Sequence, residues 1–180
     1  MTVNEFERKK ILTKEEYDAL LIKMSKVVVG HSFIQVNYYY DTSTLTYSNA
    51  NETVRVRLKE SNITFERKFG KQFFNKTCIS KETATSIETL PKTIILDGNE
   101  LTLIGNMVTF RSNFQLETFT VSLDKNYYLG IIDYEIEVEV ESERVELPTI
   151  LRIFEEKASS GKYSRFITAL TSMTNTYQVK

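Results

Sequence analysis

The chain has 180 residues, of which 41% are hydrophobic and 26% are charged. This composition is typical of a folded globular protein, the length favours a single domain over residues 1–180, and the single cysteine excludes a disulfide framework or a cysteine-rich metal site. The 23 Lys and Arg nearly balance the 24 Asp and Glu, which argues against a broad surface for nucleic acid or an anionic membrane but is compatible with a local basic site.

The first ten residues, MTVNEFERKK, are largely charged and lack the apolar core of a signal peptide. No apolar run approaches the ~20 residues that a membrane-spanning helix needs. We therefore expect a cytoplasmic protein with no membrane and no nucleic acid among its partners. The sequence leaves open whether the protein is a monomer or a homodimer.

Alternation of apolar and polar residues, the pattern of a half-buried strand, recurs along the chain. It predicts strands over residues 4–10, 34–41, 53–59, 63–69, 92–96, 101–104, 107–111, 116–124 and 133–141. Asp97-Gly98 predicts a hairpin turn, and Gly105-Asn106 predicts a weaker one. Short strands at this spacing suggest an antiparallel sheet or barrel.

Helices are predicted between these strands. Thr13 and Glu16 match a capping box, which begins a helix that ends near Lys26. Further helices are expected over residues 80–90, 148–158 and 163–173, with Pro148 suited to the first turn of the second. The predicted fold class is therefore α+β, with strands in the majority.

Charges of one sign share single faces of the predicted strands. Arg55, Arg57 and Lys59 lie on one face of their strand, and the glutamates of residues 133–141 lie on one face of theirs. Same-face neighbours are roughly 7 Å apart, so such rows repel one another unless they are paired. A sheet face open to water is the simpler interpretation, but charges segregated by sign and accompanied by Thr, Asn and Tyr fit a polar interior better.

A closed barrel with these faces inside would hold clusters of both signs. The candidate inward cations are Lys9, Arg55, Arg57, Lys59, Lys68 and Arg111. The candidate inward anions are Glu5, Glu7, Glu66, Asp124, Glu135, Glu137 and Glu139. Rows of Arg and Lys suit a polyphosphate, whereas clustered carboxylates suit Mg²⁺ or Mn²⁺. One cavity with both clusters would suit a metal–polyphosphate substrate.

Several motifs in chain order carry a resemblance to a known family. Residues 5–9 read E-x-E-x-K, residues 55–59 read R-x-R-x-K, Arg111 stands in TFRSNF, acidic residues alternate from Asp133, and Lys162 stands in SGKYSRF. In this order they resemble the CYTH superfamily, the triphosphate tunnel metalloenzymes, over nearly the whole chain. The resemblance implies an eight-stranded antiparallel β-barrel that encloses a tunnel, with helices packed outside.

The resemblance also implies roles for individual residues. The implied substrate-binding residues are Lys9, Arg55, Arg57, Lys59, Lys68, Arg111 and Lys162. The implied ligands of one or two Mg²⁺ or Mn²⁺ ions are Glu5, Glu7, Asp124, Glu135 and Glu137. The implied catalytic residues are Lys9, Arg57, Glu135 and Glu137. The strand over residues 63–69 departs from the family pattern, because Glu66 stands near where a cation is expected.

The implied enzyme is a triphosphatase that acts on a small-molecule substrate: inorganic triphosphate, a nucleoside triphosphate or thiamine triphosphate. Because the sequence offers no candidate nucleophilic side chain, water is expected to attack the terminal phosphorus directly. Two alternatives stay open. One is an adenylate cyclase, which converts ATP to cyclic AMP and pyrophosphate. The other is a non-catalytic module that binds a polyphosphate or a nucleotide.

Overall fold

The computed structural model describes residues 2–74, 76–116, 119–142, 147, 151 and 160–177. Within these residues the chain forms nine strands and three helices. In chain order they are β1 (Thr2–Leu12), α1 (Lys14–Ser25), β2 (Gly30–Asp41), α2 (Thr46–Asn49), β3 (Thr53–Lys59), β4 (Asn62–Phe74), β5 (Thr77–Ser86), β6 (Thr93–Leu96), β7 (Asn99–Leu116), β8 (Phe119–Tyr128), β9 (Ile131–Glu139) and α3 (Lys162–Tyr177).

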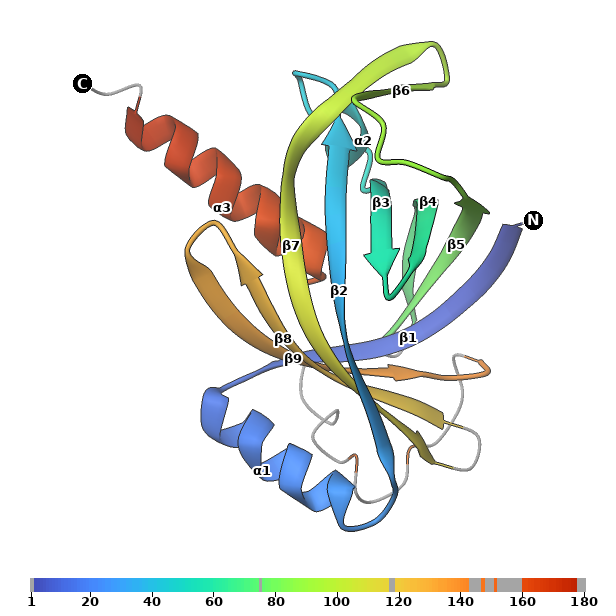
Figure 1. Cartoon of the computed structure of the whole chain (residues 1–180), viewed down its shortest axis with the longest axis vertical. Coiled ribbons are helices and arrows are strands. Elements are labelled where there is room, and N and C mark those ends of the chain that lie inside the picture. Colours follow the sequence, from blue (N-terminus) through green and yellow to red (C-terminus); the bar gives the residue numbers. More distant parts are fainter. Residues whose placement is uncertain are drawn as a thin grey trace.

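Eight strands close into a barrel (Figure 1). They are hydrogen-bonded in the order β2-β3-β4-β5-β1-β9-β8-β7, and β7 pairs with β2 to complete the ring. Every pairing is antiparallel. Among the described strands, β6 pairs with the start of β7 alone, so it forms a hairpin arm beyond the ring. The predicted α+β class and eight-stranded antiparallel barrel are confirmed.

Helix α1 covers the outside of the barrel near β9. Its predicted capping box is present: the Glu16 backbone N–H donates to Thr13 Oγ1 at 3.2 Å, and the Thr13 N–H donates to Glu16 Oε2 at 2.8 Å. Tyr17, Leu20 and Met24 are buried in a core with apolar side chains of β8 and β9. No helix among the described residues is long and apolar enough to cross a lipid bilayer.

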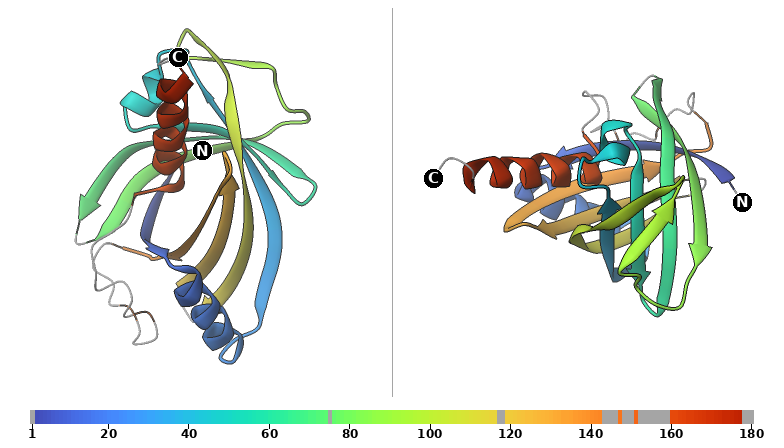
Figure 2. Two further views of the ribbon diagram at one scale, coloured as in Figure 1. Left: turned by 90° about the vertical axis from the view of Figure 1, so that its left-hand side faces the viewer. Right: turned by 90° about the horizontal axis from the view of Figure 1, so that it is seen from above.

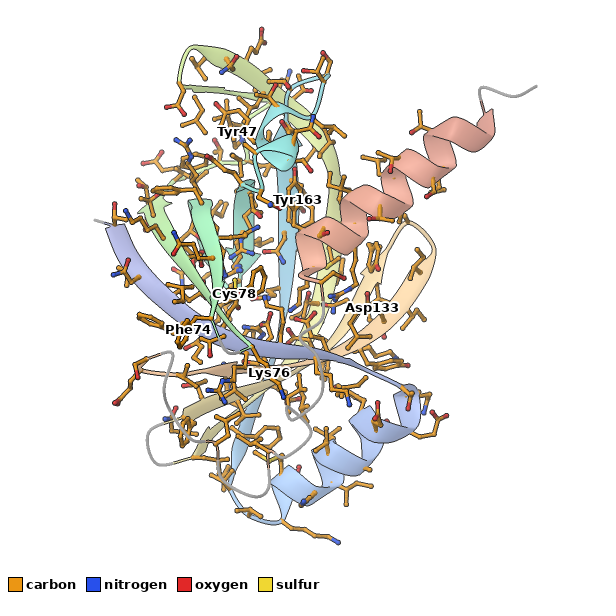
Figure 3. All side chains as sticks on the ribbon, turned by 180° about the vertical axis from the view of Figure 1, so that it is seen from behind. Tyr47, Phe74, Lys76, Cys78, Asp133 and Tyr163 are labelled. Carbon is orange, nitrogen blue, oxygen red and sulfur yellow. The ribbon has the colours of Figure 1, made fainter. Side chains whose placement is uncertain are left out.

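Helix α3 packs on the barrel through its first turns and then extends away from the strands (Figure 2). Tyr163 and Phe166 are buried against Tyr39 and Met107. The Tyr163 hydroxyl also donates to Asp41 Oδ2 at 3.0 Å, and the carboxylate of Asp41 accepts from the first turn of α2. Figure 3 shows Tyr163 at the base of α3 on the side of α2. The predicted helix over residues 163–173 is confirmed, and these contacts hold its start beside the barrel.

Two predictions of secondary structure are wrong, and a third lies outside the described residues. Residues 77–86 form strand β5 rather than part of a helix over 80–90, because they pair with β1 on one side and β4 on the other. Gly105 and Asn106 form no turn, because β7 runs continuously from Asn99 to Leu116. Of the helix expected over 148–158, only Leu151 is described, and its side chain is buried in the core beneath α1.

Gly105 is required by close packing rather than by a turn. Its φ is +147°, and a Cβ atom there would lie 2.6 Å from Cζ of Phe166. We expect Gly105→Ala to lower the free energy of unfolding by about 3 kcal/mol, because the added methyl displaces α3 from the barrel. Urea unfolding measures the loss.

Gly98→Ala is the matched control for this prediction. Gly98 also has a positive φ, +78°, but a Cβ atom added there would have no atom of the described part of the chain within 4 Å. Backbone strain alone should cost about 1 kcal/mol at this position. Equal losses in the two variants would show that contact with Phe166 does not matter.

Candidate functional site

The barrel encloses a cavity of about 470 Å³ whose walls are mostly charged. Side chains of most barrel strands and of the start of α3 face it. Its charged lining residues are Glu5, Glu7, Lys9, Arg55, Arg57, Lys68, Lys71, Glu82, Arg111, Glu137, Glu139 and Lys162. Both signs of charge therefore occur within one enclosure.

The alternation of the strands places these charges inside. On β3, Arg55 and Arg57 line the cavity, whereas Val54 and Val56 are fully buried on the outer face. These valines pack with Tyr47 of α2 and with apolar side chains of the β6–β7 hairpin. The apolar core thus lies between the barrel and the elements around it. The polar faces of the strands line the interior of the barrel.

Three carboxylates meet beside the cavity, and one of them, Glu137, lines it. Asp124 of β8 and Glu135 and Glu137 of β9 each offer an oxygen within 4.8 Å of the others. The register pairs Asp124 directly with Glu135, and both are fully buried. An all-oxygen donor set of this kind fits a hard divalent cation.

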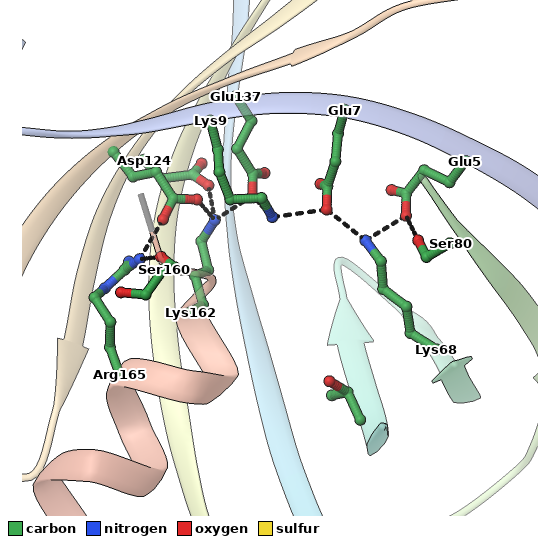
Figure 4. Close-up of polar contacts among 12 residues, drawn as sticks. Glu5, Glu7, Lys9, Lys68, Ser80, Asp124, Glu137, Ser160, Lys162 and Arg165 are labelled. Carbon is green, nitrogen blue, oxygen red and sulfur yellow. Dashed lines mark hydrogen bonds and ion pairs between the residues drawn. The ribbon is translucent and has the colours of Figure 1, made fainter. Parts of the chain in front are cut away.

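Cations compensate this three-carboxylate cluster (Figure 4). Lys162 Nζ lies 2.7 Å from Asp124, 2.6 Å from Glu135 and 2.9 Å from Glu137. Arg111 donates two hydrogen bonds to Asp124, at 2.8 and 2.6 Å, and also pairs with Glu137. Lys162 comes from the start of α3, so docking of that helix completes the cluster.

The two glutamates of the cluster titrate differently. Burial raises the pKa of Glu135 to about 7, and the neighbouring Glu137 adds to the rise. Burial also raises the pKa of Glu137, but Lys162, Arg111 and Lys9 outweigh it and hold the pKa well below its ordinary value. Glu137 is therefore the firmly ionised member of the pair.

A second set of ion pairs follows β1. Glu7 lies 2.7 Å from Lys9 Nζ and 2.8 Å from Lys68 Nζ, and Lys68 also pairs with Glu5. Burial raises the pKa of Glu7, but Lys9 and Lys68 overcome that effect and bring it to about 2. Among the described residues, Glu5 and Glu7 thus act as partners of lysines and lie outside the three-carboxylate cluster.

The two cavity arginines of β3 differ in their partners. Arg55 Nε donates to Glu66 at 2.7 Å, and Arg55 Nη2 donates to Glu82 at 3.1 Å. Arg57 donates to Asn37 Oδ1 at 3.0 Å and lies 3.5 Å from Glu66. Burial, together with repulsion from Arg55, lowers the pKa of Arg57 to about 10. Arg57 is thus a cation whose charge the protein compensates incompletely.

Lys59 differs from the other predicted binding residues, because it is not among the residues that line the cavity. Its Nζ lies 4.3 Å from the ring centre of Phe33, in a cation–π contact. It shares a strand face with Arg57 but comes at the end of β3, where the aromatic ring covers it. The prediction that Lys59 joins Arg55 and Arg57 in the cavity is corrected accordingly.

The sequence does not indicate several residues that lie in the cavity wall or next to the three-carboxylate cluster. Glu82 falls within a predicted helix, and Lys71 lies beyond the predicted end of its strand. Arg165 of α3 lies 2.8 Å from Asp133 and 2.6 Å from Glu135, and no sequence pattern indicates this. Asn37 is buried, and its Nδ2 has no hydrogen-bond partner among the described residues, so it is a free donor in the cavity wall. In the sequence, only the alternation of its strand indicates that Asn37 faces inward.

Known proteins share this architecture. A proposed adenylate cyclase from Bacillus halodurans is 26% identical, with 92% of this chain and 98% of that chain covered and a TM-score of 0.74. A proposed adenylyl cyclase from Hippeastrum, described as having a dominant triphosphatase activity, is 18% identical over 91% and 95% of the two chains, with a TM-score of 0.73. The S. pombe RNA triphosphatase Pct1 is 13% identical over 98% and 84%, with a TM-score of 0.50.

The last two likenesses show the fold alone, since their identities are low. A comparison with curated protein sequences gave no significant match. The family model of the CYTH domain matches residues 4–167, which run from β1 through all the other strands to the start of α3. This match includes the strands that surround the charged cavity, and the chain belongs to the CYTH domain family.

Proposed function

We propose that this chain, acting as one domain over residues 1–180, is a divalent-metal-dependent hydrolase of a triphosphate. The observation that carries the proposal is one cavity lined by several cations and by Glu137, which belongs to the buried three-carboxylate cluster. A cation row alone would suit any anion, and a carboxylate cluster alone would suit a metal. The two together suit a metal–triphosphate substrate.

The cations are proposed to bind the phosphate chain. The proposed set is Lys9, Arg55, Arg57, Lys68, Arg111 and Lys162, all of which line the cavity. Arg57 is the strongest candidate, because its charge is incompletely compensated before a ligand arrives. Arg55 has two carboxylate partners, so it must share its guanidinium between them and a phosphate.

The carboxylates are proposed to hold Mg²⁺ or Mn²⁺. Asp124, Glu135 and Glu137 are the proposed primary ligands, because their oxygens already converge, and the ion would replace Lys162 as their shared partner. Glu5 and Glu7 could join a second ion only by releasing Lys68 and Lys9. When bound, such an ion supplies Lewis-acid polarisation of phosphoryl oxygens and lowers the pKa of bound water.

The protein's own contribution to catalysis is position and charge. Lys9 and Arg57 are proposed to hold the phosphate oxygens on which negative charge develops, while Glu135 and Glu137 fix the opposite side of the site. The enclosure limits water, which strengthens these interactions. With no nucleophilic side chain assigned, water is the proposed attacking group on the terminal phosphorus.

The test is product analysis with Mg²⁺ or Mn²⁺ and a series of triphosphates. Release of orthophosphate, abolished by a chelator, supports the proposal. Cyclic AMP and pyrophosphate from ATP would instead support the adenylate cyclase suggested by the name of the Bacillus halodurans protein. Tight binding without any product would support a binding module.

Glu66 pairs with two cavity arginines and provides a stability prediction. It is 6% exposed, pairs with both Arg55 and Arg57, and accepts from Thr64. Burial raises its pKa, but the two arginines overcome this effect and hold the pKa at about 2. We expect Glu66→Gln to lower the free energy of unfolding by about 3 kcal/mol at pH 7, because it leaves Arg55 with Glu82 alone and buried Arg57 with no carboxylate among the described residues.

The pH dependence of this loss has a definite sign. The carboxylate's ordinary pKa is 4.5, above its folded value of about 2, so its stabilisation is complete above pH 4.5 and disappears as the pH falls toward 2. Urea unfolding from pH 7 to 3 should therefore show the variant approaching wild type. The same variant should bind triphosphate more tightly, since Arg55 and Arg57 no longer face an internal anion. A constant difference at all pH values would contradict the ion-pair explanation.

A further inference from the structure

A bulge in β4 adds two residues to the cavity wall. Phe69 pairs with Lys81 and Gln72 pairs with Ile79. Between these two pairs the chain advances by three residues on β4 but by two on β5. Gly70 provides the extra residue, at a φ of +64° that L side chains rarely adopt. One added residue reverses which side chains face inward.

The reversal brings Lys71 and Phe73 inside. Lys68, before the bulge, lines the cavity, and with unbroken alternation its inward successors would be Gly70 and Gln72. Instead Lys71 and Phe73 line it. They lie on one face of the strand, roughly 7 Å apart.

Lys71 differs from the other cavity cations in its partners. Lys9, Arg55, Arg57, Lys68, Arg111 and Lys162 each have a carboxylate within 4 Å. Among the residues that the structure describes, no carboxylate forms such a pair with Lys71, and its Nζ donates to Thr53 Oγ1 at 3.1 Å. Burial, with repulsion from Lys68 and Lys9, lowers the pKa of Lys71 to about 8. An anionic ligand would stabilise its charged form.

Phe73 lies at the opening of the cavity. It contributes to the lining, yet its exposed fraction is 67%. Figure 3 shows the same end of the β4–β5 hairpin, where the neighbouring Phe74 and Cys78 are labelled beside β1. A flat ring that is open to solvent beside a charged cavity can stack on another flat ring.

We propose that Lys71 and Phe73 form a nucleotide subsite, in which Lys71 binds the phosphate next to the nucleoside and Phe73 stacks on its base. This inference rests on the proposed function and narrows the substrate class to nucleoside triphosphates. Inorganic triphosphate has no group for Phe73 to contact. A cationic tail such as that of thiamine triphosphate would be repelled by Lys71 and by the nearby Lys68.

The first experiment compares ATP with inorganic triphosphate. We expect Phe73→Leu to raise the KM for ATP about tenfold and to leave the KM for inorganic triphosphate unchanged, since a stacked base contributes enough binding for such a change. Phe74→Leu is the matched control, because Phe74 is the next residue, is 43% exposed and does not line the cavity. Equal effects of Phe73→Leu on both substrates, or no effect on either, would overturn the subsite.

The second experiment tests Lys71 by calorimetry with the β,γ-imido analogue of ATP. Lys71→Met should raise the Kd about tenfold, and Lys71→Arg should restore it. In wild type the Kd should rise above pH 8 as Lys71 loses its proton, whereas Lys71→Arg should keep a constant Kd to pH 9.5. A wild-type Kd that is constant over this range, or unchanged in Lys71→Met, would refute the role of Lys71.

Failure of the nucleotide subsite can be distinguished from failure of the proposed function. Wild-type hydrolysis of inorganic triphosphate tests the hydrolase alone, because that substrate does not need Phe73. If hydrolysis occurs but the variants behave as wild type, only the nucleotide subsite fails. If no triphosphate is hydrolysed, the proposed function fails, and the calorimetry still decides whether Lys71 binds a nucleotide.

Discussion

Replacement of Arg57 by alanine is expected to raise the KM for a triphosphate about a hundredfold, since hydrogen bonds to charged groups contribute about 1.5–3 kcal/mol each. Arg57 is buried, and its pKa is lowered to about 10 by burial and by the neighbouring Arg55. Its positive charge is therefore costly in the empty cavity and favourable once phosphate oxygens are present. Initial rates over a range of substrate concentrations measure the change.

Arg67→Ala is the matched control. Arg67 lies on the adjacent strand β4 and pairs on its outer side with Glu52 and Asp97, away from the cavity lining. It should leave the KM unchanged. A similar rise in both variants would mean that the barrel, rather than the site, had been disturbed. A wild-type KM in Arg57→Ala would remove this residue from the proposed binding set.

Substitution of Glu137 by glutamine is expected to lower kcat by about 10²–10³-fold, the range seen when one preorganised electrostatic group is lost. Glu137 contacts Lys162, Arg111 and Lys9 and is the firmly ionised member of its pair. The KM for the triphosphate should change less than kcat, because the lost interaction strengthens toward the transition state. The metal concentration needed for half-maximal activity should rise.

Glu139→Gln is the comparison for this variant. Glu139 is the next residue on the same face of β9 and lines the cavity, but it is not part of the three-carboxylate cluster. The same loss of charge there should lower kcat far less. If kcat fell equally in Glu137→Gln and Glu139→Gln, the effect would be due to the net charge in the cavity. No decrease in Glu137→Gln would remove the proposed metal site.

The sequence could indicate the inward faces because strand alternation is a local property. The rows at Arg55 and Arg57 and at Glu135 and Glu137 could be read from spacing alone, and the structure places both rows on the interior side of their strands. The prediction of an eight-stranded barrel rested on the order of the motifs, since alternation predicts strands without showing which of them are neighbours.

The sequence of strand β5 does not predict a strand, and the reason is physical. Its sequence from Thr77 to Ser86 has polar residues on both faces, so it carries no apolar stripe of period two. Backbone ladders to β1 and β4 hold it in place, and these depend on partners far away in the sequence. Gly105 is a similar case, because its close neighbour Phe166 lies on α3.

By itself, the sequence determined which charged side chains share a strand face, because a period of two residues is set within each strand. Only the tertiary structure decided which of them meet. Asp124 joins Glu135 through the register of β8 and β9, and Lys162 joins them by the docking of α3. Lys71 enters the cavity through one extra residue at Gly70, and it lies there without a carboxylate partner among the described residues. Register, bulges and helix docking all depend on contacts between residues far apart in the sequence. A shift of one residue in any strand would reverse which of its side chains face the interior.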